Sequence, residues 1–531
     1  MKFFRISVLL ASALLACQGA DAVINNPMTQ AVIRVYDQQL QANPNDYETR
    51  YRRANEYYRH SEYIRALDDL NQILATAPTS DGTMRFDAYM MRAGIYNMTK
   101  KFDLALADLN SAIAIDGNSA AAYYQRANTE YELGDYAAAR TDYTRLQRFN
   151  SRSPEALVGL ARIAVQERNY GQATNLLEQA VSFSPNEPEV YVRRAGVRRL
   201  MEDHNGAVED LLIAISLNSR NPRAVSALID YGNTNYTAVI DGLSHAIDIA
   251  PNNGLYRYLR ATIAQAHFNY LSAIDDFNTI IDQKLYNYHG LYGSLAKCQL
   301  GLGRYDEALA SIDTATGTAQ DVAEYFVTRS KILRALNRHD DAIAAAAHAL
   351  VIDRESVPGL VEMALNFVDK GDYEQAVSHL GEAAMIDAND PSVYLLRAWL
   401  LEKYLNQPVA ARNFYQQACD VEGFDDDNVK SLRGFALLAL GRTDEADAWM
   451  GHILSTVPDN DGLINYYGAC YYAQRDDSDK ALECVEKSLK AGYSDNHNWM
   501  NNNDGTINVA ALRDDLRFLN LMQKYNYIFG K

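Results

Sequence analysis

The chain has 531 residues, with 50 basic and 68 acidic side chains and a formal net charge of −18. An acidic surface of this kind repels nucleic acid and anionic lipid, so we expect neither as a partner. The longest apolar run near the start, Ile6 to Ala16, is shorter than the roughly 20 residues of a membrane-spanning helix. We therefore expect no integral membrane segment.

Residues 1–22 predict a bacterial secretory signal, because a basic start is followed by an apolar run and small residues. Cleavage after Ala20-Asp21-Ala22 would release a chain that begins at Val23. Leu14-Leu15-Ala16-Cys17 instead resembles a lipoprotein box, which would leave Cys17 acylated at the new N-terminus. Leu15 is uncommon in that box, but both alternatives stay open. Either one predicts an exported protein, periplasmic or associated with the outer membrane.

Residues 23–46 predict a single capping helix, over Met28 to Ala42, before a long repetitive region begins.

The region 47–490 repeats a small residue with a period near 34, which is the signature of a stacked-repeat architecture. In most units a second alanine follows twelve residues later. The thirteen small anchors are Ala54, Ala93, Ala127, Ala161, Ala195, Ala227, Ala261, Ala296, Ser330, Ala364, Ala398, Gly434 and Gly468.

Each unit predicts a helix hairpin. Around Ala127, two stretches of about twelve residues have apolar positions three and four apart, which is typical of amphipathic helices. Gly134-Asp135 between them supplies a left-handed helix end and a capping side chain. The paired small residues let the two helices approach closely. A single hairpin cannot bury its apolar face alone, so the units must stack into a solenoid.

With its unit length, small anchors, an aromatic residue opening the second helix and a closing proline, the chain resembles tetratricopeptide-repeat proteins. The proline is present at Pro78, Pro185, Pro251 and Pro458. The resemblance implies an all-α superhelical solenoid of about thirteen hairpins, with capping helices at both ends. Residues 491–531 resemble the closing helices that often end such arrays.

Five units carry an arginine just before the anchor and an aspartate sixteen residues later. Where leucine or methionine replaces this arginine, the aspartate is also absent. Because the two residues are lost together, we predict that they form a partly buried, bidentate ion pair between the two helices of each such hairpin, and that this pair stabilises the fold. The predicted pairs are Arg53/Asp69, Arg92/Asp108, Arg126/Asp142, Arg194/Asp210 and Arg260/Asp276.

No catalytic constellation is visible. The ten histidines are scattered without a metal-spaced pair, and Gly301-Leu302-Gly303 is a turn between repeat helices rather than a nucleotide loop. The segments outside the repeats are too short for a further domain of about 100–150 residues. We therefore expect no enzyme activity, no metal and no cofactor.

Function is then expected on the concave face, where the resembling family binds extended peptides or partner helices. Amides can bond an extended backbone, and tyrosines offer rigid area with a polar tip. The candidate groove residues are Tyr51, Asn55, Tyr58, Met90, Asn97, Tyr124, Asn128 and Tyr131, with Gly94 between the two from the second unit.

These observations predict a non-catalytic protein-interaction scaffold in a bacterial cell envelope, with a protein partner. The alternative is a carbohydrate-handling or envelope-assembly accessory lipoprotein, in which the groove tyrosines stack on sugar rings.

Overall fold

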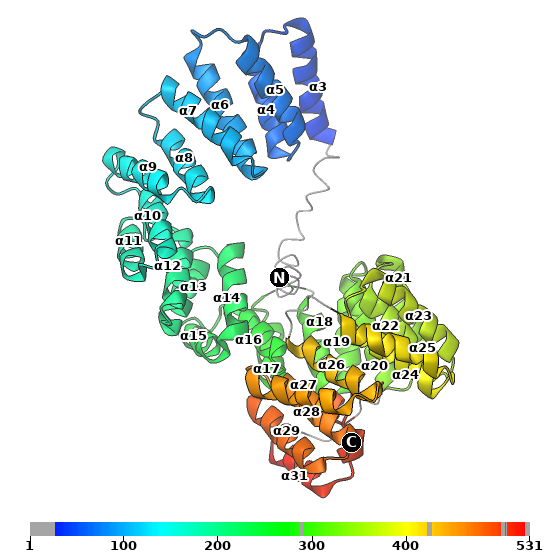
Figure 1. The fold of residues 1–531 in the computed structure, drawn as a ribbon. Helices are drawn as coiled ribbons and strands as arrows, with labels where there is room; N and C mark the ends of the chain where they lie inside the picture. Colours follow the sequence, from blue (N-terminus) through cyan, green and yellow to red (C-terminus); the bar gives the residue numbers. More distant parts are fainter. Residues whose placement is uncertain are drawn as a thin grey trace. The chain divides into compact units, whose positions relative to one another are not determined.

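The computed structural model describes residues 27–286, 288, 290–421, 427–500, 505 and 507–525. This part of the chain contains 29 α-helices and no β-strand (Figure 1). The predicted secretory signal and Cys17 lie outside the described residues.

An opening helix, α3 (Pro27–Ala42), precedes thirteen helix hairpins, which confirms the predicted all-α solenoid architecture. The hairpins are α4 (Tyr47–Arg59) with α5 (Tyr63–Thr76), α6 (Gly82–Met98) with α7 (Phe102–Ile115), α8 (Ala120–Glu132) with α9 (Tyr136–Phe149), α10 (Pro154–Gln166) with α11 (Tyr170–Phe183), α12 (Pro188–Leu200) with α13 (His204–Leu217), α14 (Pro222–Thr234) with α15 (Tyr236–Ile249), α16 (Gly254–Ala266) with α17 (Tyr270–Asp282), α18 (Gly290–Gly301) with α19 (Tyr305–Thr318), α20 (Ala323–Ala335) with α21 (His339–Ile352), α22 (Val357–Asp369) with α23 (Tyr373–Ile386), α24 (Pro391–Lys403) with α25 (Pro408–Asp420), α26 (Asp427–Ala439) with α27 (Thr443–Thr456), and α28 (Leu463–Gln474) with α29 (Ser478–Ala491).

Small residues hold the two helices of a hairpin together. In the α8/α9 hairpin, Ala127 and Ala139 are fully buried, and the ring of Tyr143 fills the interior beside them. Gly134 takes a left-handed conformation (φ 82°) and Asp135 caps α9 by accepting a hydrogen bond from the backbone N–H of Ala138. Both features follow from the sequence pattern.

The sixth hairpin departs from the expected register. Its first helix begins at Pro222, 34 residues after Pro188 begins α12, but α14 and α15 are separated by Asn235 alone. Counting back from α15 places the anchor at Ala227, which is only half-buried, while Leu228 and Ile229 are buried. The anchor prediction at Ala227 is therefore wrong, because the turn, not the helix, is shorter.

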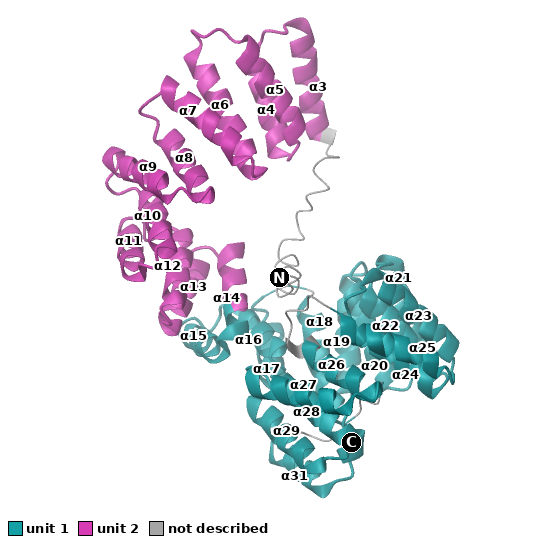
Figure 2. Ribbon diagram, viewed as in Figure 1, with its two compact units in different colours: residues 1–3, 231–531 teal, residues 4–230 magenta. Residues whose placement is uncertain are grey.

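The chain divides into two compact units (Figure 2). One comprises residues 4–230, which we call the N-terminal unit; within it the structure describes α3 to α13 and most of α14. The other comprises the described residues from Tyr231 to Tyr525, and we call it the C-terminal unit.

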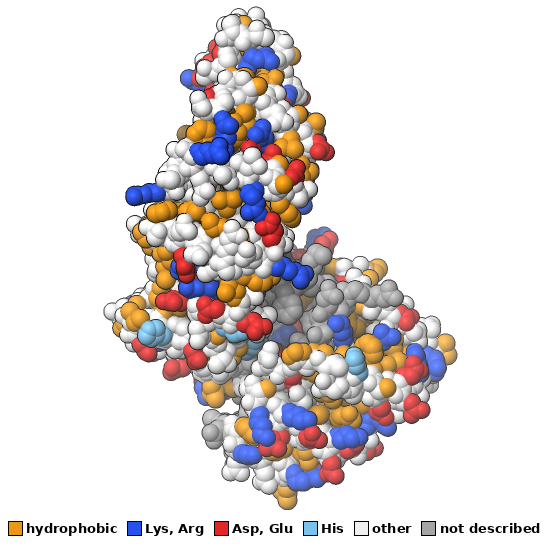
Figure 3. Space-filling view, turned by 60° about the vertical axis from the view of Figure 1, so that its left-hand side comes forward, with side chains coloured by type: hydrophobic (Ala, Val, Ile, Leu, Met, Phe, Trp, Pro, Cys, Tyr) orange, Lys and Arg blue, Asp and Glu red, His pale blue; other side chains and the backbone are white. Residues whose placement is uncertain are grey.

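The C-terminal unit ends in a short helix α30 (Asn496–Met500), a 3₁₀ turn (Ala510–Leu512) and helix α31 (Leu516–Lys524). These elements pack against the last hairpin, with the side chains of Trp499, Phe518 and Met522 fully buried. On the face shown in Figure 3, acidic and basic side chains are interspersed with apolar ones.

Candidate interaction groove

First helices of consecutive hairpins line a groove in the N-terminal unit. Its cavity has a volume of about 720 Å³, compared with about 270 Å³ for a second cavity in the C-terminal unit. Most of the lining residues come from α8, α10, α12 and α14, at positions about one helical turn apart. They are Tyr131, Val158, Ala161, Arg162, Val165, Leu177, Glu189, Val192, Arg193, Gly196, Val197, Arg199, Leu200, Arg223, Ser226, Ala227 and Asp230.

The floor of the groove is apolar and has an open point at Gly196. Val158 and Val165 of α10 and Val192 of α12 contribute aliphatic side chains. Gly196 lies one turn after Val192, and a Cβ atom added there would meet no other atom within 4 Å. The groove therefore offers apolar surface to a ligand, with additional space where Gly196 has no side chain.

Charged side chains surround this floor, and arginine predominates among them. Four arginines line the groove against two carboxylates, Glu189 and Asp230. Glu189 pairs both with Arg193 on its own helix, at 2.9 Å, and with Arg223 of α14, at 2.8 Å. Because one carboxylate is shared in this way, the groove keeps an excess of positive charge.

Arg162 is the most constrained of these arginines. Its Nη2 lies 2.8 Å from Glu132 Oε1, its Nη1 donates to Asn128 Oδ1 at 3.2 Å, and its guanidinium stacks 3.9 Å from the ring centre of Tyr131. Tyr131 also accepts a hydrogen bond from Gln166. These contacts link α8 to α10 and hold one wall of the groove in place.

Of the groove residues predicted from sequence, only Tyr131 lines this cavity. Tyr124 is 38% exposed on the same helix, whereas Asn128 accepts a hydrogen bond from the buried Tyr143 hydroxyl at 2.7 Å. Asn97 accepts one from Thr129, which links α6 to α8. These two amides connect the helices of the scaffold.

The remaining predicted residues lie in the first two hairpins. Tyr51 and Tyr58 pack partly buried against the core of the first hairpin, and Asn55 is half-buried. Met90 packs against the buried Ala93, Ala105 and Leu109. Sequence reasoning missed the groove arginines, although their positions on consecutive first helices were a readable signal.

The five predicted arginine–aspartate pairs are each brought together. In every pair the guanidinium Nε and Nη2 donate to the two carboxylate oxygens, at 2.6–3.0 Å. Such bidentate pairs restrict both the distance and the orientation of the two helices.

The aspartates of these pairs lie deeper than their arginine partners. The arginine side chains keep 12–20% of their exposure, but the aspartates have almost none, because they lie between the two helices of the hairpin. Each pair as a whole is therefore partly buried, as predicted, with the carboxylate as its interior member. The aspartates are Asp69, Asp108 and Asp142, each 4% exposed, Asp276, 1% exposed, and Asp210, 0% exposed.

Three of the aspartates also have a second arginine, in addition to the partner that the spacing predicted. Asp69 lies 3.3 Å from Arg50 Nη1, and Asp276 lies 3.3 Å from Arg257 Nη1, an arginine one turn earlier on the first helix in both cases. Asp210 lies 3.1 Å from Arg198 Nη1, one turn later. The repeat pattern did not predict these contacts, because the second arginine is present in only some of the units.

The arginines of the pairs reach back to the preceding helix as well, which the sequence pattern did not predict. The Nη1 donors of Arg53, Arg126 and Arg260 bond residues sixteen positions earlier, namely Asp37, Asn110 and Ser244. Arg92 likewise donates to Asn71. Arg329, which has no aspartate sixteen residues later, pairs with Asp313 of α19 at 2.7 Å. The arginine therefore connects successive hairpins as well as the two helices of one hairpin.

Within the described ranges, no group of three or more His, Cys, Asp or Glu side chains is placed to hold a metal ion. Across those same ranges, no helix combines the length and apolar character needed to cross a membrane. Cys298, Cys419, Cys470 and Cys484 are buried free thiols.

Comparison with known families identifies the repeating unit. The tetratricopeptide-repeat pattern matches residues 35–120, 124–188 and 294–357, and a second pattern of the same description matches residues 429–452. Together with the hairpin geometry, these matches show that the chain contains tetratricopeptide repeats.

Two curated relatives carry the same name, DnaJ homolog subfamily C member 7 homolog. The protein from Dictyostelium discoideum is 29% identical over 108 residues, which cover 20% of each chain. The one from Schizosaccharomyces pombe (strain 972 / ATCC 24843) is 24% identical over 321 residues, which cover 55% of this chain and 62% of the relative. The chain thus spans less than two thirds of either relative.

Solved structures with similar repeats include yeast Tom70, at 16% identity and a TM-score of 0.35, where the match covers 76% of this chain and 96% of that one. A tetratricopeptide-repeat protein of Thermus thermophilus matches at 22% identity and a TM-score of 0.29, over 34% of this chain and 97% of that one.

Proposed function

We propose that the chain is a non-catalytic protein-interaction scaffold that binds an extended or helical segment of a partner protein in the groove of the N-terminal unit. Tetratricopeptide repeats generally mediate protein–protein interactions. The observation that carries the proposal is the groove itself, which has apolar residues from consecutive first helices in its lining and an excess of arginine among its charged residues.

The chemistry of the groove indicates the kind of segment that fits. Apolar side chains would lie over Val158, Val165 and Val192, while carboxylates would meet the surrounding guanidinium groups. Arginine recognises carboxylates with a planar fork of donors and retains its charge at any physiological pH. We therefore expect a segment in which apolar residues alternate or cluster with acidic ones.

The test is selection from a random peptide library displayed on phage, followed by affinity measurement on the selected peptides. Arg199→Glu reverses a charge at the groove, and we expect it to weaken these peptides about tenfold or more, as is typical when a charge pair becomes repulsive. Arg148→Glu is the matched control, because Arg148 also occupies the last turn of its helix but lies outside the groove. Equal loss in both variants would contradict the proposal.

Glycans are the alternative ligand, and the same protein on a glycan array distinguishes them. Retention of sugars that survives Arg199→Glu but not Tyr131→Ala would favour the carbohydrate-handling alternative, since aromatic faces rather than charges stack on sugar rings.

We further propose that the protein acts in a bacterial cell envelope, on the strength of the basic and apolar start of the chain. N-terminal sequencing of the mature protein tests this proposal. A start at Val23 supports simple export, acylation at Cys17 supports a lipid anchor, and an intact Met1 contradicts both.

A further inference from the structure

The segment that follows the last hairpin turns back to hairpins more than 190 positions earlier in the chain. Residues 493–498, which we call the clasp, contact the turns at the ends of α16 and α18. In an ordinary solenoid each repeat contacts only its neighbours, so such a contact is not needed for stacking. It joins the two ends of the run α16–α29 within the C-terminal unit.

Hydrogen bonds to one turn carry most of this contact. The backbone N–H of Ser494 donates to the carbonyl of Phe268 at 3.3 Å, and its hydroxyl donates to the same carbonyl. That hydroxyl also accepts from the backbone N–H of Tyr270 at 3.2 Å. Further along, the Tyr305 hydroxyl lies 2.9 Å from Nδ1 of His497.

Phe268 is an unusual residue for its position. It has φ 56°, a left-handed conformation that is costly for a bulky side chain. At the corresponding turns in the described part of the array, residues with positive φ are glycine or polar, for example Gly134, Lys100 and Asn337. The ring of Phe268 lies 4.7 Å from that of Tyr493, so the strained position places an aromatic group against the clasp.

The other side of the clasp is anchored more firmly. Tyr493 and Trp499 are fully buried and their rings pack with Tyr466 of α28, at 5.0 Å and 4.9 Å. The contact toward α16–α19 includes a carboxylate, Asp495, within hydrogen-bond distance of the Tyr270 hydroxyl at 3.4 Å. Because burying a carboxylate is costly, the contact of the clasp with α16–α19 is weaker than its contact with α28.

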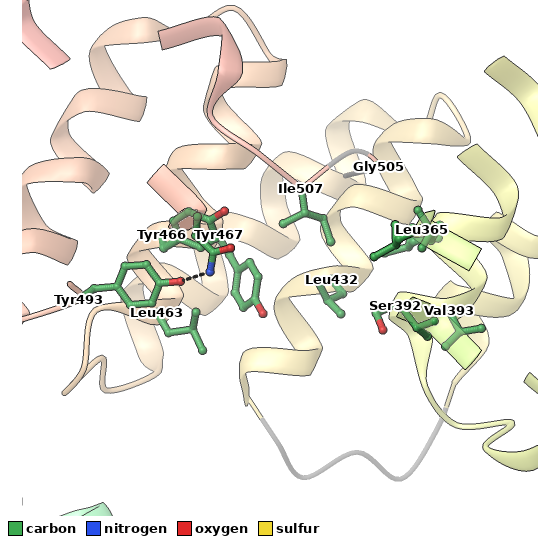
Figure 4. A pocket seen from close by; sticks show the side chains of 14 residues that line it. Leu365, Ser392, Val393, Leu432, Leu463, Tyr466, Tyr467, Tyr493, Gly505 and Ile507 are labelled. Atoms are coloured by element: carbon green, nitrogen blue, oxygen red, sulfur yellow. Dashed lines mark hydrogen bonds between the residues drawn. The ribbon is translucent and has the colours of Figure 1, made fainter. Parts of the chain in front are cut away.

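Two residues of the clasp, Tyr493 and Asn498, also line a cavity within the C-terminal unit. The cavity has a volume of about 270 Å³, and its apolar lining includes Leu365 of α22, Leu432 of α26 and Tyr467 of α28. Figure 4 shows Tyr493 at one end of this cavity, and the dashed line marks the bond from Asn498 to its hydroxyl. Both of these residues belong to the clasp.

We propose that residues 493–498 form a releasable clasp, which closes the hairpin run α16–α29 on itself until it detaches from the turns that follow α16 and α18. On release the clasp stays with α28 and α29, because its aromatic anchors are buried there. This inference is independent of the groove in the N-terminal unit.

Phe268→Gly in the full chain tests the proposal. Glycine removes the ring contact with Tyr493 and relieves the left-handed backbone. We expect hydrogen exchange in peptides covering 493–500 to accelerate by about tenfold or more, while α16 and α17 keep or gain protection. Lys100→Gly is the matched control, since it relieves the same conformation (φ 57°) in the N-terminal unit and should leave these peptides unchanged.

A second variant, Ser494→Ala, removes the bridging hydroxyl, with the exposed Ser455→Ala as its control. If peptides covering 493–500 exchange hydrogen at the same rate in both variants as in the parent, the proposal is overturned. Simultaneous loss of protection throughout α16–α29 would also overturn it, because closure would then be inseparable from folding.

Discussion

The arginine before each anchor shows how one side chain can organise a repeat. In Arg126, Nε and Nη2 bind Asp142 of the same hairpin while Nη1 binds Asn110 of the preceding one. A guanidinium can do this because it presents five N–H donors in a rigid plane. Lysine has a single ammonium group and cannot hold both partners in fixed directions.

Arg126→Ala is expected to destabilise the protein by about 3 kcal/mol, because it leaves the buried Asp142 without its partner. Arg126→Lys should recover only part of this loss. Chemical denaturation gives the free energies of unfolding. In the double variant with Asp142→Ala the cost should be smaller than the sum of the two single costs, and strict additivity would show that the pair is not coupled.

Asn128 is expected to be structural. Its side-chain oxygen accepts a hydrogen bond from the hydroxyl group of the fully buried Tyr143. Asn128→Ala should therefore lower the free energy of unfolding by about 1–3 kcal/mol. Adding Tyr143→Phe removes the orphaned hydroxyl and should restore part of the stability. If Asn128→Ala leaves the melting temperature unchanged, the amide is a surface group after all.

The pairing of Arg126 with Asp142 was predictable from the sequence because both partners repeat at a constant spacing. The contact with Asn110 was not, since the residue sixteen positions before the arginine varies from unit to unit, and where it makes this contact it is an aspartate, an asparagine or a serine. The second arginine at Asp69 and Asp276 was missed for the same reason, because it does not repeat in every unit. Tyrosines and amides were predicted at the groove, but most of them serve packing, and residue type alone does not distinguish these roles.

At the level of the helix hairpin, turn chemistry sets the boundaries. Most second helices begin at the aromatic residue that the pattern predicted, and many are capped by the residue before it. At α9, Asp135 accepts a hydrogen bond from the Ala138 N–H at 3.0 Å, whereas Lys101 before α7 makes no side-chain cap. Caps were therefore predictable. The shortened turn before α15 was not, because Ala227 lies at the usual twelve residues before Val239 and so looks like the anchor of its unit.

Asp135→Ala is expected to lower the free energy of unfolding by about 1 kcal/mol, the usual cost of removing an N-cap. Lys101→Ala, at the equivalent position of α7, should have almost no effect. Thermal melts of both variants at neutral pH make the comparison, and equal shifts would show that the caps do not contribute.

At the scale of a whole unit, the return of the clasp is the feature that local patterns could not predict. Periodicity describes neighbours in sequence, whereas the contact of Ser494 with Phe268 depends on the accumulated curvature of many hairpins. The unusual phenylalanine at a turn was the one available signal.

Asp495 in the clasp gives the C-terminal unit a pH dependence. Burial raises its pKa from 3.8 to about 6, although the Asn498 backbone N–H, the Tyr270 hydroxyl and the charge of Lys331 act in the opposite direction. The other titratable residues of the clasp are His497 and Tyr493. A raised carboxyl pKa stabilises the folded state below 3.8, and this contribution is lost as the pH rises to about 6.

Asp495→Asn removes this titration. We compare the free energy of unfolding of the variant with that of the parent at each pH. The advantage of the variant is expected to grow by about 1–2 kcal/mol from pH 4 to pH 7, because only the parent must bury an ionised carboxylate at the higher pH. Urea denaturation at both pH values measures the difference. A constant difference across that range would show that Asp495 titrates normally.

The central claim is that the groove of the N-terminal unit binds a partner segment, and Gly196→Leu tests it most directly. The Cβ atom of the leucine would meet no other atom within 4 Å, its longer side chain would occupy the open point of the floor, and the substitution should stabilise the helix by up to about 1 kcal/mol. Gly94→Leu is the matched control, because it has the same open surroundings on α6 outside the cavity. Peptides selected on the parent should bind to Gly94→Leu unchanged and lose at least about tenfold in affinity for Gly196→Leu, by analogy with other blocked hot-spot pockets. Undiminished binding to a folded Gly196→Leu variant would contradict the account.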